Sequence, residues 1–158
     1  MLKTLQDFFQ SRTITDSEVD STQQLQLAAA ALMFEVIASD GKIERSELQS
    51  MRTILAEQFS LSKEQIDELY NDAERSAHDA TDLHRFTRTI CQHWDNQQRV
   101  NLVENMWLLS LADNTIDRHE RHLVRKVAAL LHLTEGQIIK SRENARTRIK
   151  PSHWTIEG

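Results

Sequence analysis

Two short stretches of the sequence read almost alike: DGKIERSE at residues 40–47 and DNTIDRHE at residues 113–120. They begin 73 residues apart, and four of their eight positions are identical. The repetition continues downstream, since LSKEQI at residues 61–66 corresponds to LTEGQI at residues 133–138 after a shift of one residue. A motif that repeats together with its surroundings indicates an internal duplication.

Apolar residues recur at three- and four-residue spacing along most of the chain, which is the pattern of amphipathic helices, and no stretch shows convincing strand alternation. The sequence therefore predicts an all-α fold, a single compact bundle of about seven or eight helices in two pseudo-symmetric halves. The long helices are expected at about 21–39, 44–59, 62–77, 81–94, around 100–108, 117–132 and 134–150.

Length and composition predict one domain with a short segment at each end. The chain has 158 residues, and glycine and proline together account for only four of them. Residues 1–20 are expected to form an N-terminal helix and a polar connection, residues 21–150 the helical domain, and residues 151–158 a tail. Pro151 is expected to end the last helix, because proline lacks the N–H that a helix interior needs.

The chain carries the marks of a cytoplasmic protein. Its most apolar stretch, residues 27–38, has 12 residues and contains Glu35, whereas a membrane span needs about 20 apolar residues. The N-terminus has no apolar run of signal-peptide length. Cys91 is the only cysteine, so no internal disulfide can form. The net charge of −5 argues against a general nucleic-acid-binding protein, and no nucleic-acid partner is expected.

The repeated loops have a structural interpretation. Each lies between two predicted helices, and Gly41 and its counterpart Asn114 tolerate left-handed backbone. Glu44 can begin the next helix, and Glu47, three residues later, can accept a hydrogen bond from its backbone N–H. Ile43 and the corresponding Ile116 are expected to anchor the loops in the core.

The same loops have a second interpretation as a metal site. Carboxylates are the ligands that Ca²⁺ and Mg²⁺ prefer, and the loops end like the second half of an EF-hand loop. The first half is missing, because the third position would be Ala38 in one copy and Leu111 in the other. A different divalent-cation site across the two halves is the alternative that stays open. Its candidate ligands are Asp40, Glu47, Asp113, Glu120 and Glu35.

The repeated loops and the helices around them resemble those of a known family. The runs EVIASDGKIERSE, LSKEQI and WLLSLADNTIDRHERHLVRKVAALLHL are similar to the TerB-like family of bacterial tellurite-resistance proteins. The same helical domain precedes the J-domain of the membrane-anchored co-chaperone DjlA. The likeness covers residues 25–148, with Asn114 where the family usually has glycine. It implies an all-α domain of two similar halves, acidic loop residues proposed as a metal or partner site, and no established reaction.

Charge is unevenly distributed. Residues 1–116 carry 10 basic and 19 acidic side chains, whereas residues 117–150 carry 9 basic and 4 acidic ones. The last predicted helix holds Arg142, Arg146 and Arg148, which are expected either to form a solvated face that suits a helix C-terminus or to bind an acidic protein, an anionic membrane surface or RNA.

No catalytic constellation is visible in the sequence. His119 and His122 can share a helix face, but without an HExxH motif or a nearby thiol they are weak evidence for a zinc site. Cys91 reads as a packed thiol. The leading hypothesis is a non-enzymatic interaction domain that binds a protein partner at the loops and in the groove between the halves, in a stress-response or envelope-associated assembly. The alternative is a metal-ion sensor or buffer, and an unrecognised hydrolase comes third.

Overall fold

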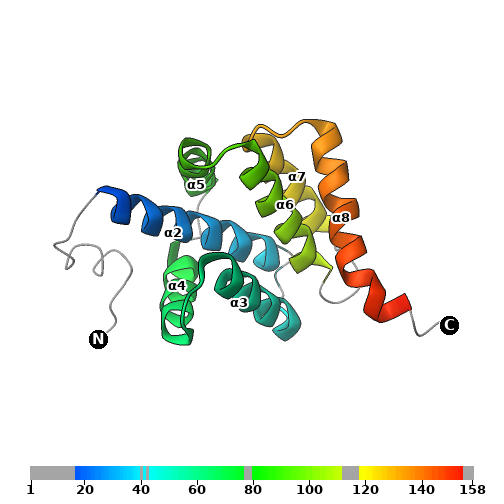
Figure 1. The fold of residues 1–158 in the computed structure, drawn as a ribbon, viewed down its shortest axis with the longest axis horizontal. Coiled ribbons are helices and arrows are strands. Elements are labelled where there is room, and N and C mark those ends of the chain that lie inside the picture. The colour runs from blue at the N-terminus through cyan, green and yellow to red at the C-terminus, as the bar shows by residue number, and fades with distance from the viewer. Residues whose placement is uncertain (1–16, 40, 42, 77–79, 112–117, 155–158) are drawn as a thin grey trace.

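The computed structural model describes residues 17–39, 41, 43–76, 80–111 and 118–154, and within these ranges every regular element is a helix. Figure 1 shows the helices gathered into one bundle. Their bounds are α2 Ser17–Ala38, α3 Arg45–Phe59, α4 Lys63–Ser76, α5 Ala80–His93, α6 Asn96–Ser110, α7 Arg118–Leu130 and α8 Glu135–Trp154. The predicted all-α fold is confirmed. None of these described helices is both long and apolar enough to cross a membrane.

Helix α2 is the central helix of the bundle. It contacts α3, α4, α5, α6 and α7, and its residues from Ala28 to Phe34 are all at most 4% exposed. Four consecutive alanines, Ala28 to Ala31, allow neighbouring helices to approach closely on every side. The apolar stretch at 27–38 is therefore a buried helix of the bundle, as its composition predicts.

Helix α6 has the same position in the second half as α2 has in the first. It packs against α7 and α8, as α2 packs against α3 and α4. Met33 and Phe34 of α2 are buried, and so are their counterparts in the repeat, Met106 and Trp107 of α6. The indole Nε1 of Trp107 donates to Ser141 Oγ of α8 at 3.1 Å, so the largest buried side chain has its polar atom satisfied.

The two halves also end their second helices in the same way. Ser60 after α3 and His132 after α7 both have left-handed backbone, with φ of 55° and 66°. In each case the N–H of the next residue donates to the carbonyl five residues earlier, at 3.3 Å from Leu61 and 3.1 Å from Leu133. This is the Schellman arrangement at equivalent positions of the repeat.

The third helix of each half begins with the same reciprocal pair of hydrogen bonds. Gln65 N–H donates to Ser62 Oγ at 3.2 Å, and Ser62 N–H donates to Gln65 Oε1 at 2.9 Å. Thr134 and Gln137 make the same two bonds before α8, at 3.1 and 3.0 Å. Both pairs are capping boxes, and the two have the same geometry.

Two predicted helix ends differ from the structure. Helix α2 begins at Ser17, before the predicted start at about residue 21. Polar residues can form the first turn of a helix even where they do not cover the core. Helix α8 continues through Pro151 to Trp154. Proline removes one helical N–H and crowds one carbonyl, which costs free energy near a helix end without stopping the helix.

Candidate functional site

The corner between α2 and α3 is built from local hydrogen bonds. Ser39 Oγ donates to the Val36 carbonyl at 2.8 Å, and Gly41 N–H donates to the Ala38 carbonyl at 3.1 Å. Gly41 has a φ of +83°, a conformation that residues with a Cβ rarely adopt. The chain therefore leaves α2 at Gly41, the residue predicted to adopt left-handed backbone in this loop.

Glu47 is committed to the helix that follows this corner. Glu44 is the N-cap of α3, and its backbone N–H donates to Glu47 Oε1 at 3.1 Å within a capping box. Glu47 is only 2% exposed, so its carboxylate is withdrawn from solvent and placed at the positive end of the helix dipole. The structural interpretation of Glu44 and Glu47 is confirmed for the first loop.

The second loop is described only from Arg118 onward. Glu120 occupies the third position of α7, as Glu47 does in α3, and is also 2% exposed. It already has an interaction partner, as does the half-buried Glu35. Asp40 and Asp113, the other two candidate metal ligands, lie outside the described residues. Among the residues described, no group of three or more His, Cys, Asp or Glu side chains is arranged to hold a metal ion.

Ile43 does not anchor its loop. It is 42% exposed, which makes it one of the most exposed large apolar residues of the described chain. The prediction that it plugs into the core is wrong, because the capping bonds of Glu44 and Glu47 fix the corner without it. Its counterpart Ile116 lies outside the described residues.

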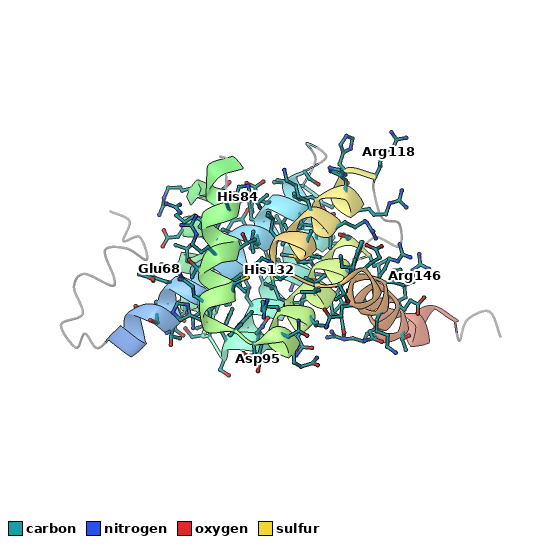
Figure 2. All side chains as sticks on the ribbon, turned by 90° about the horizontal axis from the view of Figure 1, so that it is seen from above. Glu68, His84, Asp95, Arg118, His132 and Arg146 are labelled. Atoms are coloured by element: carbon teal, nitrogen blue, oxygen red, sulfur yellow. The ribbon has the colours of Figure 1, made fainter. Side chains whose placement is uncertain are left out.

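The three arginines predicted to bind a partner have different surroundings. The Arg142 guanidinium lies 5.9 Å from the centre of the Trp107 ring. Arg148 pairs with Glu104 of α6 at 2.9 Å. Arg146 is exposed on the outside of α8 (Figure 2). Two of the three cations therefore hold α8 against α6, and only Arg146 is directed entirely to solvent.

A groove runs between the two halves, where α3 of the first half faces α6 and α8 of the second. It consists of two adjoining hollows of about 300 and 350 Å³ that share Ile54, Glu57 and Arg148. One hollow has polar walls that include Asn101 and Glu104. The other has more apolar walls, supplied by Leu108, Leu111 and Ile149 in addition to Ile54. The two hollows lie where the sequence predicts a hydrophobic groove between the halves, but only one of them has mainly apolar walls.

A chain of hydrogen bonds crosses the floor of the groove. Arg148 of α8 donates to Asn105 Oδ1 of α6 at 3.3 Å, and Asn105 Nδ2 donates to Gln58 Oε1 of α3 at 3.1 Å. These two bonds link α3, α6 and α8 across the polar hollow. Gln58 and Asn105 are not among the site residues predicted from the sequence. The signal was present, because both are amides on helix faces that otherwise pack inward.

The remaining candidates behave as structural residues. Cys91 is half-buried, and its thiol lies 3.8 Å from the Leu130 carbonyl. Trp94 stacks on Phe59 with ring centres 6.2 Å apart. His119 and His122 lie on the exposed side of α7. The surroundings of Cys91 agree with the packed thiol that the sequence predicts.

Comparisons with known proteins identify the family. Residues 26–143 match the family model described as tellurite resistance protein TerB. This chain belongs to the TerB family. The matched residues run from α2 into α8 and include both acidic loops and most of the groove, whereas the groove residues Arg148 and Ile149 lie beyond them. No curated protein matches.

One solved structure shares the fold of this TerB-family chain. It is a protein of unknown function from Porphyromonas gingivalis W83, with a TM-score of 0.60 and 19% sequence identity. The alignment covers 78% of this chain and 88% of that one. At this level of identity the likeness concerns the fold alone. The resemblance to the TerB-like family inferred from the repeated loops is confirmed.

Proposed function

We propose that this TerB-family protein is a non-enzymatic, cytoplasmic interaction domain that binds a protein partner in the groove between its halves. The observation that carries the proposal is the groove itself, with a floor fixed by Arg148, Asn105 and Gln58. A preformed hollow loses little conformational entropy on binding, which favours association. The likeness to tellurite-resistance proteins supports a place in a bacterial stress-response or envelope-associated assembly, where peripheral contact with a membrane is compatible with the role.

The walls of the groove suit an amphipathic helix. Ile54, Leu108 and Ile149 offer apolar contact, and the exposed Glu57 offers a carboxylate. A partner helix with apolar residues three and four positions apart, flanked by a basic residue, would match both kinds of contact.

Site-specific photocrosslinking in the native host tests this proposal. A photoreactive residue at Thr53, which lines the groove and is exposed, should trap a discrete partner, and one at the exposed Gln92 of α5 should not. Ile54→Ser in the same chain should weaken the crosslink. The proposal fails if Thr53 and Gln92 trap the same proteins, or if Ile54→Ser leaves the crosslinks unchanged.

Binding of Ca²⁺ or Mg²⁺ by the acidic loops is the second candidate function. It is based on the acidic pattern of the two loops, whose described carboxylates Glu47 and Glu120 are buried to the same extent at matching positions. Calorimetric titration of metal-free protein tests it. Heat of binding and a rise in melting temperature at millimolar Ca²⁺, Mg²⁺ or Mn²⁺ are expected, and the absence of both ends the idea.

A further inference from the structure

The exposed side of α7 is almost entirely basic. Its buried side is formed by Glu120, Val124, Val127 and Ala128, and Glu120 is the only acidic residue in the helix. Arg118, Arg121 and Lys126 are exposed on the other side. Figure 2 shows Arg118 at the same end of the molecule as Arg146 of α8. We call these four cations the basic face: Arg118, Arg121 and Lys126 on the exposed side of α7, and Arg146 on α8 at the same end of the molecule as Arg118.

Helix stability does not account for the basic face. Arg118 and Arg121 lie in the first turns of α7, where the helix dipole is positive and cations are unfavourable. Neighbouring cations do have partners, since Arg125 pairs with Glu135 and Arg142 lies over Trp107. Within the described part of the chain, by contrast, the four residues of the basic face make no ion pair.

The first half of the molecule serves as an internal control. The counterpart of Arg121 in α3 is Leu48, and the counterpart of Lys126 is Thr53. Arg146 of α8 corresponds to Glu74 of α4. Arg118 corresponds to another cation, Arg45, but α3 and α4 form the same structural unit without cations at the positions of Arg121, Lys126 and Arg146, so the fold does not require those three.

We propose that the basic face binds an acidic segment of a partner protein. Three of its four cations are arginines, whose guanidinium groups match carboxylates in two-pronged hydrogen bonds. Ile139, which is 38% exposed, lies two helical turns before Arg146 on the same side of α8 and adds an apolar contact. The exposed Glu143 lies between them on that side, so the cations of this surface are carried mainly by α7. Mixed basic and apolar character suits a protein segment.

This inference rests on the proposed role as a protein-binding domain, but it concerns a surface apart from the groove. The test uses the full chain and a short fluorescein-labelled helical peptide whose glutamates are spaced three and four residues apart around one leucine. The test variant replaces Arg118, Arg121 and Arg146 with serine. The matched control replaces the exposed cations Arg45, Lys63 and Arg88 with serine, which changes the net charge equally. Circular dichroism and thermal melting establish that both variants fold.

At physiological salt the wild-type chain and the matched control should bind the peptide with similar affinity, and the triple variant should bind roughly tenfold more weakly. Ile139→Ser should weaken binding several-fold, and the groove variant Ile54→Ser should leave it unchanged. Equal binding by the triple variant and the control, or no binding by the wild type, would overturn the proposal. So would binding of phosphatidylglycerol vesicles or single-stranded RNA through the same arginines as tightly as the peptide. An effect of Ile54→Ser equal to that of the triple variant would contradict separate surfaces.

Discussion

At the scale of single residues, the buried carboxylate of Glu47 supports the corner between α2 and α3. Glu47→Ala removes the acceptor of the Glu44 N–H and the negative charge at the start of α3. We expect a loss of about 1–2 kcal/mol in the free energy of unfolding. Urea denaturation measures it.

Glu47→Gln is the matched comparison, because an amide oxygen still accepts the hydrogen bond while the charge is lost. It should cost less stability than Glu47→Ala. A metal role for this carboxylate would show a different pattern, with Glu47→Gln losing the effect of added Ca²⁺ as completely as Glu47→Ala.

Tyr70 is expected to make stability depend on pH in alkaline solution. Burial raises the pKa of its phenol above the ordinary value of 10.0, Glu74 raises it further, and Arg52 acts in the opposite direction. Above pH 10 the unfolded chain therefore loses this proton before the folded chain does. The contribution to the free energy of unfolding is complete below pH 10 and is lost as the pH rises through the folded pKa.

Phenolate absorbance measures this pKa directly, because Tyr70 is the only tyrosine. The folded protein should titrate above pH 10, and the urea-unfolded protein near 10. Tyr70→Phe, which retains the ring packed edge-on at 5.7 Å from Phe34, should flatten the alkaline fall in stability. Identical titration curves in the two states would contradict the account.

Single residues show where sequence reasoning succeeds and where it stops. The roles of Gly41, Glu44 and Glu47 were predictable because each depends on bonds within a few residues. The exposure of Ile43 and the engagement of Arg148 were not. They depend on which helix lies opposite, and a side chain's own sequence neighbourhood does not specify that.

At the scale of helices, the two left-handed C-caps are suboptimal residues at equivalent places. Ser60 and His132 both have a Cβ at positive φ, which destabilises the folded state by about 1–2 kcal/mol. Glycine avoids this strain but adds conformational entropy to the unfolded chain, which favours unfolding by about 0.4–1 kcal/mol. Ser60→Gly and His132→Gly should each raise the free energy of unfolding by about 0.5 kcal/mol. Thermal and urea unfolding measure the change.

Ala129→Gly is the control for these two variants, because Ala129 is exposed near the end of α7 but lies within the helix. It should lower the free energy of unfolding by about 1 kcal/mol. If glycine at 60 or 132 destabilises the protein as much as glycine at 129, the left-handed caps are not formed.

Helix ends were predictable to the extent that local chemistry decides them. Ser62 and Asp95 cap α4 and α6 as their sequences indicate, each with a glutamine three residues later. The continuation of α8 past Pro151 was not predictable. The free-energy cost of a proline competes with the stability of the rest of the helix, so the presence of a proline alone does not predict where the helix ends.

At the scale of the whole molecule, duplication explains the paired features. The buried pairs at 33–34 and 106–107, the Schellman turns after α3 and α7, and the capping boxes before α4 and α8 occur at matching positions of the two halves. The sequence predicted the two halves because the repeated motifs are local. It did not predict the shape of the groove between them, which depends on how α3, α6 and α8 meet.

The most direct test of the duplication is the backbone conformation of the second corner. Gly41 in the first corner has a φ of +83°. Its counterpart Asn114 belongs to a residue type that tolerates left-handed backbone. NMR of the labelled protein, through the three-bond HN–Hα coupling and backbone chemical shifts of Asn114, should give a positive φ, with residues 113–120 following the path of residues 40–47. A negative φ at Asn114, together with an unrelated path through residues 113–120, would contradict the descent of the two halves from one repeated unit.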